Sequence, residues 1–452
     1  MIFTRIFTDD FPFSPRKWPF FYGYFIVLCT ALGLIVSVPG QTIGVSVFTD
    51  YLIRNLDVTR FQLSNAYMIG TIGSSLIIGR TGRLLDRVGV RLISFFTALC
   101  FGLTLIAMSR VDRVADAVNA LTGNISPRAV SLVVVTTGFL CMRYLGQGII
   151  ALGARIMLMK WFSDLRGRMN SIVGIAVSFA FAGSPVLFET LIRRFSWRGA
   201  WLVLGCAIGG AASLFIWSFF RDTPEASGLL PDGRRDGMEE KGESSGGKAE
   251  RGYTLAEAQR TLTFWVFNLS CSMFSLFATA FTFHVVSIFR EAGHSRADAI
   301  SVFLPGSVVA VTTGLLSGWL SDREPFKSRL KYLLMVQQGG MLLLSAGLLL
   351  LRQDYGRYLV IVGNGLATGL FGNMVAISWP RLFGRAHLGA ISGRNMSFLV
   401  FFSAVGPPIF GWAFSRLGSY APAITLCTAI NALILVAAFR AHNPQLRRMR
   451  PE

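Results

Sequence analysis

The sequence predicts an all-α membrane protein with twelve transmembrane helices in two pseudo-symmetric bundles of six. Three observations carry this prediction: a high content of apolar residues, twelve apolar stretches of membrane-spanning length, and a charged motif that occurs once in each half. Of the 452 residues, 52% are hydrophobic. A soluble protein of this length is less apolar, so the lipid bilayer is the expected solvent for most of the surface.

The twelve stretches each contain roughly 20 mostly apolar residues, the length that crosses the hydrocarbon core. A polar stretch with Pro224, Pro231 and a Gly246-Gly247 pair follows the sixth one and has the composition of a flexible linker. The expected parts are a cytoplasmic N-terminus at 1–19, a first bundle at 20–220, a cytoplasmic linker at 221–261, a second bundle at 262–440 and a cytoplasmic tail at 441–452. The spans are expected near 20–48, 62–84, 91–109, 130–156, 169–191, 198–220, 262–288, 298–320, 330–351, 356–379, 389–413 and 421–440.

The distribution of the basic residues predicts the orientation. A net charge of +19 could suggest a nucleic-acid partner, but the lysines and arginines follow the loops. With the N-terminus inside, every lysine lies on a segment predicted to be cytoplasmic, as the positive-inside rule requires. We therefore expect no nucleic-acid partner and a multi-pass protein of a cell membrane, a bacterial inner membrane, with both termini cytoplasmic.

Two shorter helices are expected outside the spans. Apolar residues from Val111 to Leu121 recur at i, i+3, i+4 and i+7, as in an amphipathic helix lying on the outer surface. Its partner could be lipid headgroups or the protein's own outer loops. Thr254 and Glu257 have capping-box spacing, which predicts a short helix before the seventh span, with an unstructured lead-in as the alternative.

A charged motif between two apolar stretches occurs in both halves of the chain. The first copy reads Gly-x-Leu-x-Asp-Arg-x-Gly-x-Arg, and its Gly-x-Leu-x-Asp-Arg core returns after a later apolar stretch. Repetition of a charged hinge indicates that the chain contains two copies of one bundle. The residues concerned are Gly82, Asp86, Arg87 and Arg91 in the first copy and Gly318, Asp322 and Arg323 in the second.

This motif resembles the signature between the second and third helices of the major facilitator superfamily, and the Asp322 copy lies where that family repeats it. The resemblance covers nearly the whole chain and implies the major facilitator fold. In that family the aspartate docks against the amino-terminal, electropositive end of a helix in the other half. The resemblance therefore implies that Asp86 and Asp322 are gating residues that latch an outward-open state. The alternative is that these charges only fix the topology of the inner loops.

A finer resemblance points to the monocarboxylate transporters and the oxalate-formate antiporters. It rests on Pro224-Glu225 and on Trp161, Phe162, Arg166, Gly167, Gly174 and Gly183. The charged residues of both groups are missing, however. Gln41 replaces a lysine of the animal transporters, Ala310 and Gly314 replace an aspartate and an arginine, and Leu399 replaces an antiporter lysine. Neither lactate-proton symport nor oxalate-formate exchange is therefore implied.

Arg143 is the first candidate for substrate binding. It lies in the middle of the span at 130–156, where an unpaired arginine costs about 2.5 to 3.5 kcal/mol, so it should face a watery cavity. A guanidinium in such a cavity can hold a carboxylate bidentately. The alternative is an arginine bonded to helix carbonyls or to Gln147. Arg143 and Gly146 are also similar to the Arg-x-x-x-Gly motif of the family, with the Gln147-Gly148 pair shifted by one place.

Other polar residues within the spans are weaker candidates. Gln41 and Thr42 follow Pro39-Gly40, which should break the first helix and expose backbone to a cavity. The remaining substrate-binding candidates are Tyr67, Tyr144, Asn364 and His284, and each could instead serve packing. His284 would suit a proton-coupled step, although no carboxylate within the spans is evident to form a relay. Arg394 and Arg155 could attract anions at the inner mouth or extend to inner headgroups.

We therefore expect a secondary active transporter of a small organic anion, a monocarboxylate, that works by alternating access as a monomer. A proton or a counter-anion would couple transport, and no cofactor, metal or ATP-binding motif is expected. Alternatives are an exporter or importer of neutral or cationic small molecules, and a solute sensor of the same fold. A membrane enzyme is disfavoured because the four histidines are scattered and no catalytic motif is present.

Overall fold

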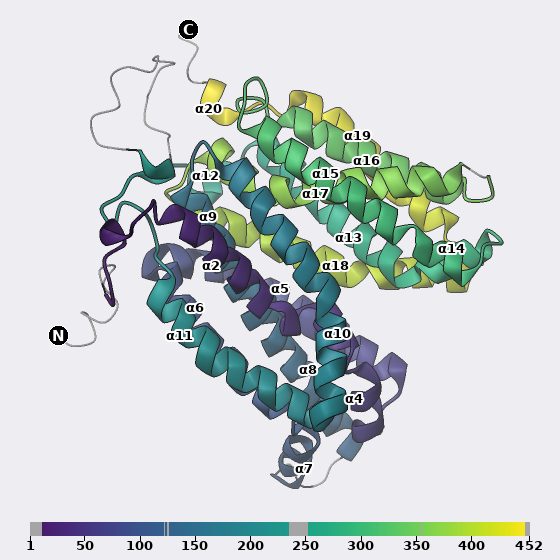
Figure 1. Cartoon of the computed structure of the whole chain (residues 1–452). Helices are drawn as coiled ribbons and strands as arrows, with labels where there is room; N and C mark the ends of the chain where they lie inside the picture. Colours follow the sequence, from purple (N-terminus) through teal and green to yellow (C-terminus); the bar gives the residue numbers. More distant parts are fainter. Residues whose placement is uncertain (1–10, 122, 124–125, 235–251, 354, 448–452) are drawn as a thin grey trace. The chain divides into compact units, whose positions relative to one another are not determined.

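The computed structural model describes residues 11–121, 123, 126–234, 252–353 and 355–447, in which all regular structure is helical (Figure 1). The chain divides into two compact units. Unit one comprises Met1–Trp161 and Ala176–Asp236, and unit two comprises Phe162–Ile175 and Gly237–Glu452. Parts of the predicted N-terminus, linker and tail, at 1–10, 235–251 and 448–452, lie outside the described residues.

Long helices joined by short turns form unit one. A capping box begins α5, where Thr59 Oγ1 accepts from the backbone N–H of Gln62 and the Gln62 side chain accepts from that of Thr59. The helix ends at Gly89, whose φ of +100° favours glycine. The helices are α2 (Gly23–Val36), α3 (Thr42–Ser46), α4 (Thr49–Leu56), α5 (Arg60–Val88), α6 (Val90–Met108), α7 (Val111–Leu121), α8 (Pro127–Met142), α9 (Ala151–Trp161), α10 (Arg166–Cys206) and α11 (Ser213–Phe219).

Two π-helices interrupt this unit. One, Arg143–Ile150, connects α8 to α9, and the other, Ala207–Ala212, connects α10 to α11. The predicted spans at 169–191 and 198–220 lie on two helical segments that meet at Ser196, where a φ of +64° and a ψ of 168° are not helical. π-helical turns are rare in proteins, and those that occur are often at functional sites. The π-helix at Arg143–Ile150 therefore supports Arg143, its first residue, as a candidate functional residue.

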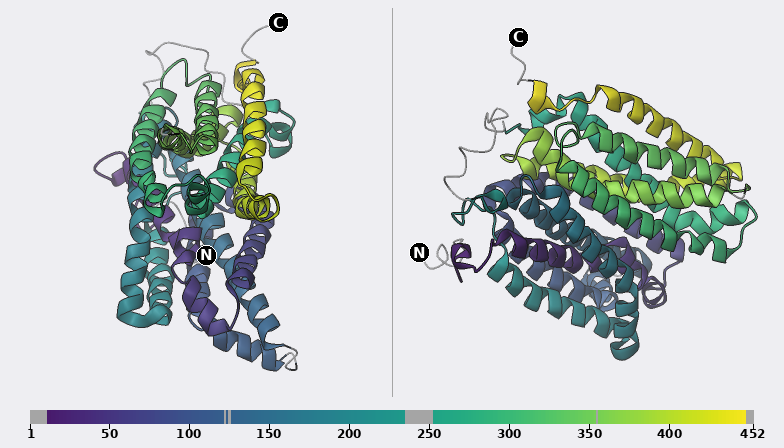
Figure 2. Two further views of the ribbon diagram at one scale, coloured as in Figure 1. Left: turned by 90° about the vertical axis from the view of Figure 1, so that its right-hand side faces the viewer. Right: turned by 45° about the horizontal axis from the view of Figure 1, so that its top comes forward.

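In unit two, both consecutive helices and helices that are distant in sequence pack side by side. Helix α16 lies against α17 and α19, and α13 lies against α18 (Figure 2). The helices are α12 (Leu255–Gln259), α13 (Leu262–Glu291), α14 (Arg296–Ser301), α15 (Phe303–Ser321), α16 (Lys331–Leu349), α17 (Gly356–Phe383), α18 (Leu388–Leu417), α19 (Ala421–Arg440) and α20 (Pro444–Arg447).

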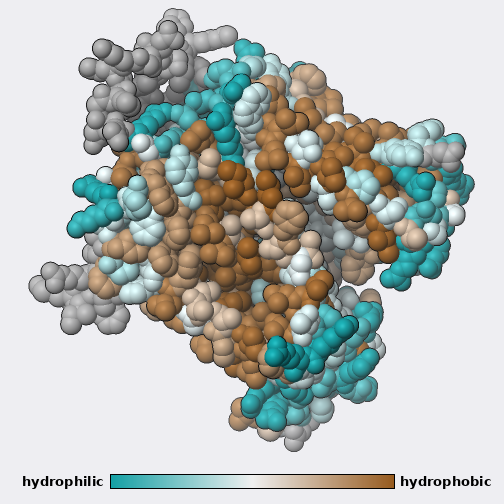
Figure 3. Space-filling view, in the orientation of Figure 1, coloured by the Kyte–Doolittle hydropathy of each residue, from teal (hydrophilic) through white to brown (hydrophobic). Residues whose placement is uncertain are grey.

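The surface of both units carries large exposed apolar side chains over the middle of the helices. Phe179 of α10 is 75% exposed in unit one, and Leu433 of α19 is 69% exposed in unit two. Hydrophobic residues cover the bodies of the helices in Figure 3, and hydrophilic residues gather at the ends. In the described part of the chain, 10 helical stretches are long and apolar enough to cross a membrane. One of them, Arg166–Phe219, contains 54 residues.

Both short helices expected outside the spans are present. Helix α7 buries Val111 and Ala115 against its own unit, while Leu121 at its end is 87% exposed. Helix α12 begins with the predicted capping box, in which Thr254 and Glu257 bond each other's backbone N–H. The amphipathic spacing and the capping-box spacing were therefore sufficient to predict these two elements.

Candidate functional site

The first helix breaks at Pro39-Gly40, as the sequence predicts. Helix α2 ends at Val36, a 3₁₀ turn covers Val38–Gly40, and Gln41 is extended before α3 begins at Thr42. Proline has no N–H to donate, so the break leaves carbonyl groups of this segment without helical partners. The carbonyl of Gly40 is one of them, and it faces Arg143.

Glycine allows this break to lie close to the π-helix. A Cβ atom on Gly40 would lie 2.4 Å from the carbonyl oxygen of Met142 and 3.2 Å from the Cα of Gly146. Any side chain at Gly40 would separate the two backbone segments. The close approach therefore brings the broken first helix within reach of the Arg143 side chain.

Arg143 is the first residue of the π-helix and is only 2% exposed. Its Nη1 lies 3.5 Å from both the carbonyl oxygen of Gly40 and Oγ1 of Thr42, at the long limit for hydrogen bonds. Its Nε has no hydrogen-bond partner. Among the described residues no carboxylate pairs with Arg143. The guanidinium is thus buried with two weak partners and no counter-ion.

Two of the predicted ligands surround this guanidinium. The ring centre of Tyr67 lies 5.6 Å from the guanidinium carbon, within the range of a cation–π contact. The Tyr67 hydroxyl donates to Oγ1 of Thr42 at 2.9 Å. Thr42 is exposed, whereas Arg143 is buried, so the hydroxyl of Thr42 lies between the arginine and the surface of the unit.

Two other predicted ligands in this unit bond elsewhere. The amide nitrogen of Gln41 donates to Ser37 at 3.2 Å, and the hydroxyls of Tyr144 and Thr81 lie 2.8 Å apart. Gln147, one turn beyond Arg143, has a buried Oε1 without a partner. The alternative interpretation, in which Arg143 bonds helix carbonyls, is supported only by the long contact to the Gly40 carbonyl.

The predicted candidates of unit two have their own surroundings. His284 lies 2.9 Å from the Pro407 carbonyl oxygen through Nε2 and 3.2 Å from the Tyr420 hydroxyl through Nδ1. Both ring nitrogens are therefore engaged, as in a packing histidine. Asn364 lies in α17 near Gly306 of α15.

The two arginines predicted at the inner mouth are both half-buried. Arg155 belongs to α9 and Arg394 to α18, and in each the Nε lacks a hydrogen-bond partner. The guanidinium of Arg394 lies 5.1 Å from the ring centre of Phe398.

Asp322 binds the amino-terminal end of α10 within unit two. Its two carboxylate oxygens accept from the backbone N–H groups of Gly167 and Arg168, both at 3.0 Å. Nη2 of Arg381 donates to the same carboxylate at 2.6 Å. First-turn N–H groups lack helical partners and form the electropositive end of the helix, so this carboxylate satisfies them.

The glycines around Asp322 allow this contact. A Cβ atom on Gly318 would lie 2.0 Å from Ser171 Oγ and 2.6 Å from the carbonyl oxygen of Gly167. A Cβ atom on Gly167 would lie 2.2 Å from the carbonyl oxygen of Gly318. The motif therefore needs glycine because two backbones meet at this point. Arg323 is exposed and lies 3.8 Å from the ring centre of Trp319.

The first copy of the motif has different partners in unit one. Asp86 lies 3.9 Å from Nζ of Lys160, and Arg87 is exposed. Gly82 is buried within α5. Arg91 is 2% exposed; its backbone N–H donates to Asp222, and its Nε donates to the carbonyl of Trp217. Arg91 thus joins the beginning of α6 to the end of α11.

Several residues of these contacts were not predicted from the sequence. Asp222 and Arg381 are single charged residues in loops or at helix ends, where position alone carries little information. Asn170 donates to Asn373 Oδ1 at 2.9 Å, and Asn373 donates to Ser317 at 2.7 Å. A polar residue on an otherwise apolar helix indicates a buried hydrogen bond there. The sequence does not identify its partner, because the partner depends on tertiary packing.

Comparison with known proteins identifies the family. The model of the Major Facilitator Superfamily matches residues 23–363, which include the broken first helix, Arg143 and both copies of the charged motif. The chain belongs to the Major Facilitator Superfamily. Members of this superfamily are membrane transporters that carry small solutes, and this one is a multi-pass membrane transporter rather than an enzyme.

Individual proteins similar to this superfamily member include a mouse (Mus musculus) relative, monocarboxylate transporter 12. The two are 25% identical over 295 residues, which cover 60% of this chain and 58% of the relative, so the match spans less than two thirds of that protein. Similar solved structures include an outward-facing bacterial homologue of the iron transporter ferroportin, with 14% identity and a TM-score of 0.62 over 92% of this chain and 99% of that one.

Two further structures of transporters share the fold. The human organic anion transporter MFSD10 (TETRAN) is 15% identical, with a TM-score of 0.58 over 91% of this chain and 98% of that one. The Major Facilitator Superfamily transporter FucP, in the outward conformation, is 13% identical with a TM-score of 0.61 over 93% of this chain and 99% of that one. At these identities the likeness concerns the fold alone.

Proposed function

We propose that this protein is a secondary active transporter of a small organic anion, a monocarboxylate. The observation that carries the proposal is the buried guanidinium of Arg143, which has two weak acceptors and no carboxylate partner among the described residues. A substrate carboxylate would form short, charge-assisted hydrogen bonds with this group and remove the cost of the unpaired charge. The names of the mouse monocarboxylate transporter and the human organic anion transporter agree with this solute class.

In this mechanism Tyr67 and Thr42 complete the site. The hydroxyl of Thr42 would donate to the second carboxylate oxygen, and the Tyr67 ring would hold the guanidinium in place. Arg155 and Arg394 would raise the local concentration of anions at the inner mouth. Gln41, Tyr144, Asn364 and His284 stay secondary candidates because their contacts lie with other groups or, for Asn364, with the neighbouring helix.

Transport would follow alternating access of two six-helix halves with twelve spans, driven by a proton or counter-anion gradient, in a monomer of the bacterial inner membrane with both termini cytoplasmic. Asp86 and Asp322 would act as latches. The contacts of Asp322 with the first-turn N–H groups of α10 support this role, because separating them would leave two N–H groups without partners and the buried carboxylate with its ion pair to Arg381 alone.

Uptake by proteoliposomes tests the proposal. A panel of radiolabelled monocarboxylates, dicarboxylates and neutral or cationic compounds is offered to the wild type, to Arg143→Gln and to Arg113→Gln. We expect uptake of a monocarboxylate that falls roughly 10- to 100-fold in Arg143→Gln, since hydrogen bonds to charged groups contribute about 1.5 to 3 kcal/mol. Arg113 is exposed on α7 and serves as the matched control. Transport confined to neutral or cationic compounds, or anion uptake unchanged in Arg143→Gln, would refute it.

A further inference from the structure

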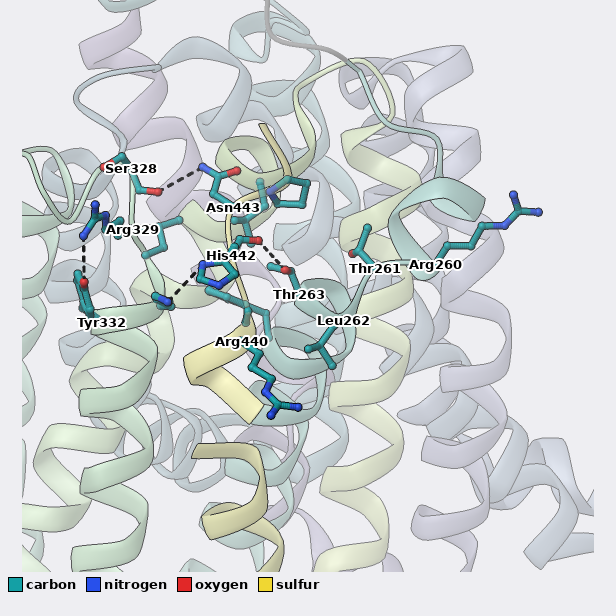
Figure 4. A pocket seen from close by; sticks show the side chains of 16 residues that line it. Arg260, Thr261, Leu262, Thr263, Ser328, Arg329, Tyr332, Arg440, His442 and Asn443 are labelled. Carbon is teal, nitrogen blue, oxygen red and sulfur yellow. Dashed lines mark hydrogen bonds between the residues drawn. The ribbon is translucent and has the colours of Figure 1, made fainter. Parts of the chain in front are cut away.

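Unit two contains a pocket that the proposed transport mechanism does not use. Its volume is about 720 Å³, and it lies at the amino-terminal ends of α13 and α16 and the carboxyl-terminal end of α19 (Figure 4). The four basic side chains of Arg260, Arg329, Lys331 and Arg440 line it together with His442. Among the described residues that line it there is no carboxylate. A pocket with this charge attracts an anion.

The polar groups of the pocket are held in place by a small set of bonds. Lys331 Nζ donates to the carbonyl of Phe439 at 2.9 Å and lies 3.4 Å from Nδ1 of His442. Thr263 donates to the carbonyl of His442 at 2.7 Å. These contacts fix the end of α19 against the first turns of α13 and α16. The partial positive ends of these two helices add to the charge of the side chains.

The distribution of the basic groups indicates the size of the anion. In Figure 4, Arg329 lies beside Tyr332 on one side of His442, Arg260 extends away from it on the other, and Arg440 lies below it, so the three guanidinium groups do not converge on one point. Such spacing suits a group larger than a single small ion. Apolar side chains contribute as well: Phe267 and Leu330 line the pocket, and Leu262 at its edge is 50% exposed. Phe267 and Leu330 are buried, so Leu262 is the one of these three residues that offers contacts to the glycerol and upper acyl region of a lipid.

We propose that this pocket binds the phosphate headgroup of an anionic phospholipid. The guanidinium groups would bind phosphate oxygens, and the apolar edge would contact the lipid backbone. A basic pocket between helix ends at the boundary of apolar spans lies where lipid headgroups are found. The inference does not depend on the transported solute, because neither Arg143 nor its neighbours belong to the pocket.

Ligand-induced thermal stabilisation of the whole detergent-solubilised protein tests this inference. Dihexanoyl phosphatidylglycerol, dihexanoyl phosphatidylcholine and glycerol phosphate are each titrated at constant ionic strength while the unfolding midpoint is followed. We expect the phosphatidylglycerol to raise the midpoint at a concentration at least tenfold lower than the other two compounds. The test variant combines Arg329→Gln with Arg440→Gln, and it should lose this preference.

The control variant combines Arg352→Gln with Arg416→Gln. Both are exposed arginines of the same unit: Arg352 lies just after the carboxyl-terminal end of α16, and Arg416 lies in the last turn of α18. The control variant removes the same charge and should keep the preference for phosphatidylglycerol. Equal loss in both variants would overturn the assignment to this pocket. Glycerol phosphate acting as strongly as the lipid would overturn the assignment of a lipid. If the test variant fails to fold, the single substitutions Arg329→Gln and Arg440→Gln take its place.

Discussion

At the scale of single residues, the surroundings of Arg143 differ from those of the other buried arginines. Arg91 donates to the carbonyl of Trp217 at 2.8 Å, and Arg381 binds Asp322 at 2.6 Å. Arg143 has two contacts of 3.5 Å, a ring face and an unpaired Nε. Arg91 and Arg381 thus have the short bonds that a structural arginine requires. The bonds that Arg143 lacks are those that a bound carboxylate would supply.

Tyr67 provides a prediction about this site. Replacement by Phe keeps the ring over the guanidinium and removes the hydroxyl that donates to Thr42. Thr42 then loses a fixed orientation, so we expect the KM for the transported anion to rise about two- to tenfold, equivalent to one hydrogen bond of about 0.5 to 1.5 kcal/mol. Initial uptake rates over a range of solute concentrations measure the effect. Tyr51→Phe in α4 is the control, and a rise of equal size there would contradict a role for Tyr67.

The sequence was sufficient to propose Arg143 and the break at Pro39-Gly40, because an intramembrane charge and a Pro-Gly pair stand out from an apolar background. It was not sufficient to separate Thr42 from Gln41, which are neighbours of similar polarity. Their backbone conformations differ: Gln41 is extended and turns its side chain to Ser37, whereas Thr42 begins α3 and faces Arg143. That distinction depends on the packing of the first helix against the π-helix.

At the scale of elements, the π-helix at Arg143–Ile150 explains a feature of the sequence. The Gln147-Gly148 pair is displaced by one place relative to the motif that it resembles. A π-helical turn contains an additional residue compared with an α-helical turn, so it can absorb such a displacement and return the later residues to register. Hydrophobic periodicity could not reveal this turn, because the segment contains only eight residues. The displacement of the Gln147-Gly148 pair was the feature of the sequence that could have indicated the π-helix.

The contact between α15 and the beginning of α10 gives a prediction about stability. Replacement of Gly318 by Ala would place a Cβ atom 2.6 Å from the carbonyl oxygen of Gly167, so the two backbones must separate. We expect destabilisation by about 1 to 3 kcal/mol, as for overpacked cores. Thermal unfolding of the purified protein measures it. A Cβ atom on Gly339 in α16 would meet nothing within 4 Å, so Gly339→Ala should be neutral or stabilising. Equal midpoints for the two variants would contradict the close approach.

Helix α7 provides a prediction about pH. Hydrogen bonds from Arg198 hold the pKa of Asp112 below its ordinary value, with Nη1 and Nη2 at 2.7 and 2.8 Å from the two carboxylate oxygens. A depressed pKa in the folded state contributes stability that is present above the ordinary Asp pKa of about 3.9 and is lost as the pH falls below it. The pair is partly exposed, so its contribution is about 1 kcal/mol or less.

The corresponding experiment compares the wild type with Asp112→Asn. The wild type should unfold at a higher temperature at pH 7, and the difference should shrink progressively as the pH falls below the ordinary Asp pKa of about 3.9. Asp116 lies one turn further along α7 and is exposed, so Asp116→Asn is the matched control and should show no difference at either pH. A difference between wild type and Asp112→Asn that persists unchanged at pH 3 would contradict the role of this carboxylate.

At the scale of the whole molecule, the sequence predicted helical class and family, because the apolar stretches and the repeated motif are long-range regularities. The number of crossings is harder to predict. Helix α5 contains Arg80, Arg83, Asp86 and Arg87 toward its end and is not among the ten apolar stretches. Arg166–Phe219 counts as one of the ten, although the backbone is not helical at Ser196 within it. The proposed twelve spans therefore require that α5 crosses the membrane and that Arg166–Phe219 crosses it twice.

Topology mapping tests both requirements. Single cysteines are placed, in a background without the six native cysteines, at exposed arginines of each half and labelled with a membrane-impermeant maleimide in intact cells. With twelve spans and a cytoplasmic N-terminus, Arg113→Cys and Arg352→Cys should react from outside, while Arg83→Cys and Arg323→Cys should react only after permeabilisation.

Between Arg83 and Arg323 the proposal places six crossings, an even number, so the two sites share a side. If Arg166–Phe219 crossed only once, they would lie on opposite sides and only one would require permeabilisation. If α5 did not cross, the labelling of the first pair would be inverted: Arg83→Cys would react from outside, and Arg113→Cys would react only after permeabilisation. A matching pattern in both halves would also place the charged motifs, and with them the proposed latches, on the cytoplasmic side.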